Sequence, residues 1–188
     1  MTDHYEFDAS EYDEPIAEHE NHDDGMDEFW DEYGMPAQAL LRLTYEDSSG
    51  QASERLFETR LFTGPSSAFS ILGHCHMRNA ERTLRIDKIT HCVDEQTGKP
   101  VEDVYEYLFD LYEKTPDYSL DRVADIHIDT LRAAMHMAGC AGLTELEQVT
   151  VIKQICQQLS GDSRITMEPV SKLVQRYAGV PPTGVDQT

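Results

Sequence analysis

The feature that most constrains the fold is a change in the spacing of apolar residues between residues 92 and 100. Before it, apolar and polar residues alternate, so that Leu41, Leu43 and Tyr45 fall on one face of the chain and Arg42 on the other. An alternation of period two predicts β-strands. After it, apolar residues recur every three to four positions, which is the spacing of amphipathic helices. The sequence therefore predicts an α+β fold, with a sheet followed by a helical domain.

Turn sequences divide the alternating region into four short strands. The segments DSSG, TGPSS and RNAE are rich in residues that favour turns. Short antiparallel strands joined by such turns predict a small, strongly bent sheet or an open barrel. The strands are expected over residues 39–47, 54–62, 68–77 and 82–90.

Four helices are predicted after residue 100, and local signals mark their ends. Ser119 is the candidate N-cap of the second helix, and a Thr-Pro pair is expected to stop the first one. Thr144 and Glu147 have the spacing of a capping box at the start of the third helix, and Gly161 ends it. The fourth helix has a proline in its first turn. The helices are expected over residues 101–114, 119–139, 144–161 and 168–179.

Negative charge is concentrated at the N-terminus. The first 34 residues hold fourteen Asp and Glu and no Lys or Arg, so they contribute −14 of the formal net charge of −21. Repulsion among these carboxylates and the lack of an apolar period predict a disordered acidic arm over residues 1–35. Aromatic residues alternate with the acids, as in segments that dock on a basic or apolar surface, and a tail that only solubilises the chain is the alternative. The arm is expected to precede a β domain at 36–93 and a helical domain at 100–180.

The composition also bears on the cellular compartment. The sequence has no run of 18 apolar residues and no secretory signal, so the protein is expected to be soluble and cytoplasmic. Four cysteines without CxxC spacing do not predict a disulfide framework, and we expect them to be small buried hydrophobic residues.

The strand region carries the residues of a family resemblance. The segment GHCHMRNAERTLRIDKI is close to a pattern of an aromatic-Cys-His stretch, a short loop and Arg-Thr-Phe-Arg-Leu-Asp-Arg-Ile. LTYEDSSG with SERLFE matches an opening hairpin in which a Tyr and a following Arg recur. Through these residues, the stretch from about 40 to 90 resembles a WYL domain, the small Sm-like β module of many bacterial ligand-responsive transcription regulators. Phe69, Ser70 and Ile71 stand in place of the Trp-Tyr-Leu of the family, and Lys88 in place of its last arginine.

The helical region resembles a TerB-type helical domain more distantly, through MAGCAGLTELEQ, in which Cys140 opens the turn. His127 and His136 lie on the predicted second helix and are expected to be packing or surface residues rather than ligands. Regulators with WYL modules usually carry an N-terminal helix-turn-helix, and this chain has an acidic arm there instead. It is therefore not expected to read a DNA sequence by itself.

The WYL resemblance implies a shallow basic pocket for a negatively charged ligand, either a nucleotide or a single-stranded nucleic acid. Guanidinium groups offer planar, bidentate donors to phosphate oxygens, and an adjacent tyrosine can stack on a base. Charge pairing on a solvated sheet face is the alternative interpretation of the same residues. The candidate ligand-binding residues are Tyr45, Arg55, Arg82, Arg85 and Lys88.

A zinc site is a further hypothesis for residues 74–92, because this segment begins with His-Cys-His and ends with His-Cys. On a strand, however, His74 and His76 point to one face and Cys75 to the other, so the three cannot ligate one ion without a bulge. We therefore expect no metal and no cofactor. The chain also lacks a nucleophile elbow, a Gly-rich phosphate loop and an HExxH motif, so no enzymatic activity is expected.

Two functions from different classes follow. In the first, a regulatory module senses an anionic effector through the WYL-like pocket and relays binding through the helical domain to a partner protein or a second copy in a homodimer. In the second, the acidic aromatic arm imitates nucleic acid and occupies the basic groove of a partner protein. Mutation of the arginines should abolish the first function, and deletion of the arm the second.

Overall fold

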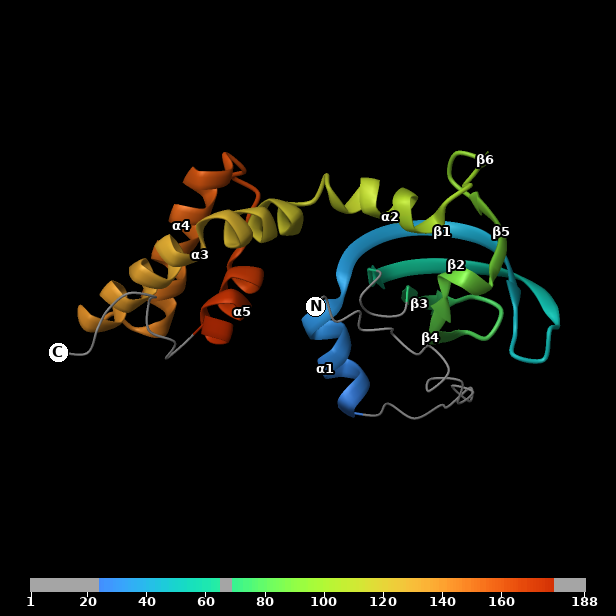
Figure 1. Ribbon diagram of the computed structural model, residues 1–188, viewed down its shortest axis with the longest axis horizontal. Helices are drawn as coiled ribbons and strands as arrows, with labels where there is room; N and C mark the ends of the chain where they lie inside the picture. The colour runs from blue at the N-terminus through green and yellow to red at the C-terminus, as the bar shows by residue number, and fades with distance from the viewer. Residues whose placement is uncertain (1–23, 65–68, 178–188) are drawn as a thin grey trace, which may run out of the picture. The chain divides into compact units, whose positions relative to one another are not determined.

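The structure is a computed structural model, and it describes residues 24–64 and 69–177 (Figure 1). Within these residues the predicted α+β class is confirmed, with a six-stranded antiparallel sheet and five α-helices. The chain divides into two compact units. The sheet unit comprises residues 24–34 and 39–102, and the helical unit comprises residues 35–38 and 103–177. Within the described residues, no helix has the length and apolar character needed to cross a membrane.

The sheet has the strand order β4-β3-β2-β1-β5-β6. Alternating buried and exposed residues along β1 and β2 show that one face of these strands lines a core, as the period-two pattern predicts. Thr59 of β2 is buried and joins β1, because its Oγ1 accepts a hydrogen bond from the backbone N–H of Ala39 at 2.9 Å. The strands are β1 (Met35–Glu46), β2 (Ala52–Phe62), β3 (Ser70–Cys75), β4 (Ala80–Arg85), β5 (Ile89–Asp94) and β6 (Lys99–Pro100).

The connection between β4 and β5 shows that the sheet is strongly bent. Three strands lie between β4 and β5 in the sheet order, yet only the short 3-10 helix η3 (Ile86–Lys88) joins them along the chain. In a flat sheet, four strand spacings measure about 19 Å. The chain from Arg85 to Ile89 spans at most about 14 Å when fully extended. The sheet must therefore curl until β4 and β5 approach each other.

The fourth predicted strand, over residues 82–90, differs from the structure. Its two halves belong to different strands, because Leu84 of β4 pairs with Ile71 of β3 and Ile89 of β5 pairs with Tyr45 of β1. The segment between them turns as η3. Alternation of apolar residues holds from Leu84 to Ile86 and breaks before Ile89, but this break alone does not reveal that the partner strand changes.

The predicted acidic arm also differs in its last part. Residues 24–33 form the helix α1 (Asp24–Tyr33), in which Trp30 is only 5% exposed and packs edge-on against Phe29 with 5.5 Å between ring centroids. Burial of the tryptophan ring offsets part of the entropy cost of ordering this short helix. Residues 1–23 lie outside the described residues, so disorder there remains a prediction.

The helical unit contains α2 (Val104–Tyr112), α3 (Pro116–Cys140), α4 (Glu145–Ser160) and α5 (Met167–Tyr177). Apolar residues from α3, α4 and α5 share one core, together with Ile165 from the loop before α5. The largest fully buried side chains of this core include Leu131, Ile152 and Val170. The stripe of apolar residues on each helix thus packs against the other two.

Helix ends in this unit confirm one predicted set of caps and correct another. The capping box of Thr144 and Glu147 forms as predicted, and Gly161 caps α4 with a left-handed backbone (φ +72°). The N-cap of α3 is Thr115, not Ser119, because the Thr115 side chain accepts from the backbone N–H of Tyr118 at 3.2 Å. The Thr-Pro pair therefore begins the second helix, since proline is favoured in a first turn.

Candidate functional site

Two of the predicted binding residues contact each other on the β1–β2 hairpin. The guanidinium of Arg55 lies 4.8 Å from the centroid of the Tyr45 ring, in a cation–π contact. Arg55 is on the same face of β2 as the buried Phe57 and is itself only 7% exposed. An arginine this buried is uncommon unless it is paired. The hydrogen-bond partners of the Arg55 guanidinium therefore decide how this residue is stabilised.

The donors of Arg55 are only partly used within the described residues. Its Nε donates to Oγ of Ser53 at 3.0 Å, and its two terminal amino groups make no hydrogen bond to a described residue. Neither amino group is among the fully buried polar atoms that lack a partner, so both reach solvent. Arg55 thus combines a buried stem, fixed by Ser53 and Tyr45, with two amino groups that have no hydrogen-bond partner among the described residues.

Asp47 contributes a negative charge that interacts with Arg55. Hydrogen bonds from the Ser49 side chain and the Gln51 backbone, together with the charge of Arg55, lower the pKa of Asp47. Its Oδ1 is already occupied by Ser49 and Gln51, with contacts of 2.6 to 2.9 Å. The Asp47 carboxylate therefore interacts electrostatically with Arg55 but forms no hydrogen bond to its amino groups.

Most other arginines of the sheet form ion pairs. Arg42 binds Glu95 at 2.7 Å and Glu54 at 3.2 Å. Arg60 pairs with Glu81 at 3.1 Å. Such exposed pairs stabilise the surface weakly and leave little charge for a ligand.

Arg85 separates from the other predicted binding residues. Its Nε and Nη2 bind the carboxylate of Asp87 at 3.0 and 2.7 Å. Because side chains alternate along a strand, Arg85 lies on the face of β4 opposite to Arg82 and the buried Leu84. The charge-pairing interpretation therefore fits Arg85 best.

Arg82 and Lys88 are half-buried and form no ion pair within the part of the chain that the structure describes. Lys88 ends η3 and directly precedes Ile89, which pairs with Tyr45. The structure thus brings Tyr45 and Arg55 into contact and places Lys88 one residue from the strand beside Tyr45. Arg82 forms no hydrogen bond, ion pair or ring contact with these described residues.

Sequence reasoning missed Ser53 and Asp47 as parts of this site. The signal for Ser53 was present, because residues two apart on a strand share a face and Ser53 precedes Arg55 by two. The signal for Asp47 was the β-turn sequence, in which an aspartate commonly accepts from nearby backbone amides.

The His-Cys-His segment lies at the end of the β3–β4 hairpin. His74 and His76 lie together, with 5.0 Å between ring centroids, while Cys75 is fully buried. Cys92 is buried in β5, where burial and then the charge of Asp94 raise its pKa to about 11. Among the described residues, no three potential metal ligands gather at one point.

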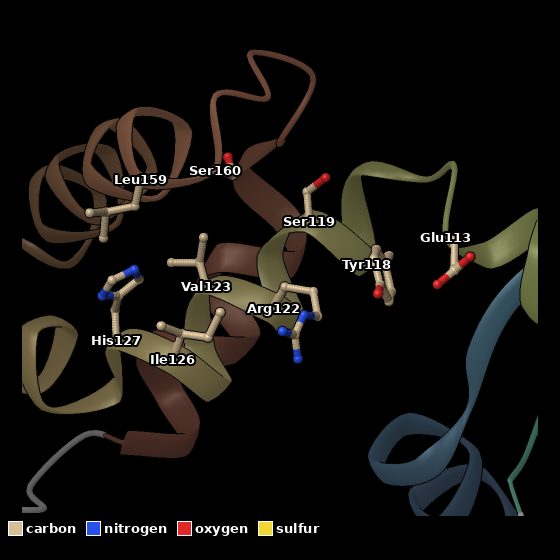
Figure 2. A pocket seen from close by; sticks show the side chains of 9 residues that line it. All are labelled: Glu113, Tyr118, Ser119, Arg122, Val123, Ile126, His127, Leu159 and Ser160. Atoms are coloured by element: carbon tan, nitrogen blue, oxygen red, sulfur yellow. The ribbon is translucent and has the colours of Figure 1, made fainter.

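A shallow hollow of about 280 Å³ lies in the helical unit beside a kink of α3 at His127. Figure 2 shows Val123, Ile126 and His127 of α3 facing Leu159 of α4 around it, while the guanidinium of Arg122 points away from Leu159. Both polar and apolar residues line the hollow, and none of the predicted binding residues is among them.

Comparison of the chain with family models, with curated proteins and with solved structures gives no match. The resemblances to WYL and TerB domains rest on the residues quoted above and remain predictions.

Proposed function

We propose that the sheet unit binds an anionic ligand, a nucleotide or a single-stranded nucleic acid, at a site centred on Tyr45 and Arg55. Lys88 adds positive charge beside this site, and Arg82 adds a further cation on β4, which an extended single strand would have to reach separately. The helical unit relays binding to a partner protein. This is a regulatory role without catalysis.

The observation that carries the proposal is the state of Arg55. A guanidinium fork presents two parallel donors that match two phosphate oxygens, and a fork already fixed by packing loses less entropy on binding. Ser53 and the Tyr45 ring hold this fork from two sides. A phosphate would complete a hydrogen-bonding set that the described residues leave incomplete.

The curled sheet supports the same proposal. The order β4-β3-β2-β1-β5, with only η3 between β4 and β5, agrees with the Sm-like module that the WYL resemblance implies. In that module the ligand is expected at the basic residues of these strands. Arg85 takes part only where a ligand displaces Asp87.

Fluorescence anisotropy of a labelled oligothymidylate with the full chain tests the proposal. Arg55→Lys keeps the charge and loses the fork, and we expect it to weaken binding about tenfold, equivalent to about 1.4 kcal/mol. Arg82→Gln and Lys88→Gln should each remove one phosphate contact and so reduce the slope of log affinity against log salt concentration by about one.

Arg42→Gln is the matched control, because it removes an arginine of the same sheet that is already paired with glutamates. It should leave the affinity nearly unchanged. Equal losses from Arg42→Gln and Arg55→Lys, or an absence of binding at low salt to both the oligothymidylate and a labelled nucleotide, would contradict the proposal.

A second function, nucleic-acid mimicry by the acidic segment, is favoured by α1. Its residues Asp27, Glu28, Asp31 and Glu32 are exposed, while Trp30 anchors the helix to the sheet unit. A fixed row of carboxylates could occupy the basic groove of a partner. If Asp27→Asn with Glu28→Gln abolishes capture of a protein partner and Arg55→Lys does not affect it, mimicry is the better explanation.

A further inference from the structure

The last turn of α3 carries two metal-ligand side chains that touch. The Sγ of Cys140 lies 3.6 Å from the Nε2 of His136. The two residues are four positions apart, so they share one face of the helix. Both are exposed to solvent. The pair thus opens outward at the end of the helix.

This distance fits two neighbouring ligands of a tetrahedral ion. Zinc binds thiolate at about 2.3 Å and imidazole nitrogen at about 2.0–2.1 Å. At a tetrahedral angle, these bond lengths separate the sulfur and the nitrogen by about 3.6 Å. A thiol–imidazole hydrogen bond spans a similar length, so the two states can interconvert without movement of the helix.

Two ligands from one chain leave such an ion half coordinated. Among the described residues no third ligand approaches the pair. Met137 and Leu146 lie close to Cys140 in the chain and are 65% and 70% exposed. Exposed large apolar side chains near the end of α3 and the start of α4 are surface that a second copy of the chain would cover.

We propose that two copies of this chain share one zinc-class ion, each supplying Nε2 of His136 and Sγ of Cys140. Each Cys140 thiol releases its proton to solvent on binding. Two thiolates then neutralise the divalent ion, and two neutral imidazoles complete the tetrahedron. The site is incomplete in one chain alone.

The other thiols of the chain do not compete for this role. Cys75, Cys92 and Cys156 are all buried, and Cys140 is the one exposed cysteine of the four. The alternative exposed pair, His74 and His76, has no accessible thiolate beside it, because Cys75 is fully buried. A thiolate-to-metal signal therefore reports on Cys140.

The full chain, reduced and stripped of metal with a chelator, should be titrated with Co²⁺ as a spectroscopic probe. We expect a thiolate-to-cobalt charge-transfer band and tetrahedral d–d bands that saturate at half an equivalent per chain. Sedimentation velocity with Zn²⁺ should show conversion of monomer to dimer, reversed by chelator.

Cys140→Ser should abolish the charge-transfer band, and His136→Gln should abolish zinc-dependent dimerisation. His76→Gln, which removes an exposed histidine of the other pair, should leave both signals unchanged and is the matched control. The proposal is overturned if Cys140→Ser keeps the band, if the chain stays monomeric at saturation, or if one ion binds per chain.

Discussion

The hydroxyl of Tyr112, the last residue of α2, donates a hydrogen bond to the carboxylate of Asp121 in α3. The Tyr112 ring is buried and packs edge-on against Tyr118, with 5.4 Å between ring centroids. Burial, then the hydrogen bond to Asp121 and its charge, raise the pKa of Tyr112 well above its usual range. This contact ties α2 to the three-helix core of the helical unit.

Removal of the hydroxyl by Tyr112→Phe should lower the free energy of unfolding by about 1 kcal/mol, because Asp121 loses its donor while the ring packing is retained. Urea unfolding followed by circular dichroism measures this change. Tyr118→Phe is the control, since it removes a hydroxyl from the same aromatic cluster without breaking this bond. Equal effects of the two changes would show that Asp121 does not depend on Tyr112.

The Tyr112–Asp121 hydrogen bond also predicts that the folded protein loses stability at alkaline pH. A tyrosine whose folded pKa is raised favours the neutral form in the folded state, so its contribution to stability is complete below the unfolded pKa of about 10 and is lost above it. The urea midpoint of the full chain should fall as pH rises beyond about 10. Tyr112→Phe should reduce that fall, and an unchanged slope in this variant would be evidence against the assignment.

Acid should act on a different bond. Hydrogen bonds from the side chain and backbone of Arg164, and from Ser119, hold the pKa of Asp162 well below its usual range. Stability from a carboxylate with a lowered pKa is present above the unfolded value of about 3.9 and is lost as pH falls below it. Asp162→Asn should therefore flatten the acid limb of the stability profile of the helical unit. Thermal unfolding at a series of acidic pH values measures this, and an unaltered acid limb would disprove it.

Two glycine substitutions should have opposite effects. A Cβ at Gly73 in β3 would lie 2.1 Å from the backbone oxygen of Glu58 in β2, so Gly73→Ala forces the strands apart. We expect it to cost several kcal/mol, at the severe end of the range for single changes, which is above about 4. Gly139→Ala meets open space in α3 and should stabilise the helix by about 0.5–1 kcal/mol. Thermal melting of both variants tests the contrast, and a mild Gly73→Ala would show that β2 and β3 can separate.

The acidic N-terminal segment should compete with the proposed ligand. Residues 1–23 hold nine of the fourteen acids that precede residue 35, and as a tethered polyanion they act at an effective concentration of roughly millimolar order. Deletion of these residues, which leaves α1 and its buried Trp30 in place, should increase affinity for an oligothymidylate several-fold at low salt. The gain should vanish at about 1 M salt, where screening is nearly complete. An equal or lower affinity after deletion would exclude competition.

Local signals predicted the parts of the fold that depend on neighbouring residues. The capping box of Thr144 and the left-handed Gly161 were predictable because each depends only on residues within one helical turn. The predicted N-cap of α3 was wrong, because Thr115 and Ser119 are both followed by helix-forming residues in the sequence. Only the fold shows that Ser119 lies inside the helix and donates to Asp162 at 2.9 Å. That contact joins residues far apart in the sequence.

The candidate site was predictable in type but not in arrangement. The spacing of Arg82 and Arg85 shows that they lie on opposite faces if the strand is regular, and the Arg85–Asp87 pair is itself local. The contact of Arg55 with Tyr45 depends on the register of the β1–β2 hairpin, and the pairing of β1 with β5 shifts by a bulge between Thr44 and Tyr45. No local pattern encodes such a shift.

The pairing of β1 with β5 sets an order in time. Leu41 of β1 lies opposite Asp94 of β5, so one of the two hydrogen-bonding edges of β1 pairs with a strand that is synthesised much later. Contacts between residues so distant in sequence form slowly, because a long loop must close first. During synthesis, β1 can pair with β2 and β3 can follow, but one edge of the nascent sheet stays open. The first strand to leave the ribosome is thus completed only after residue 94 has emerged.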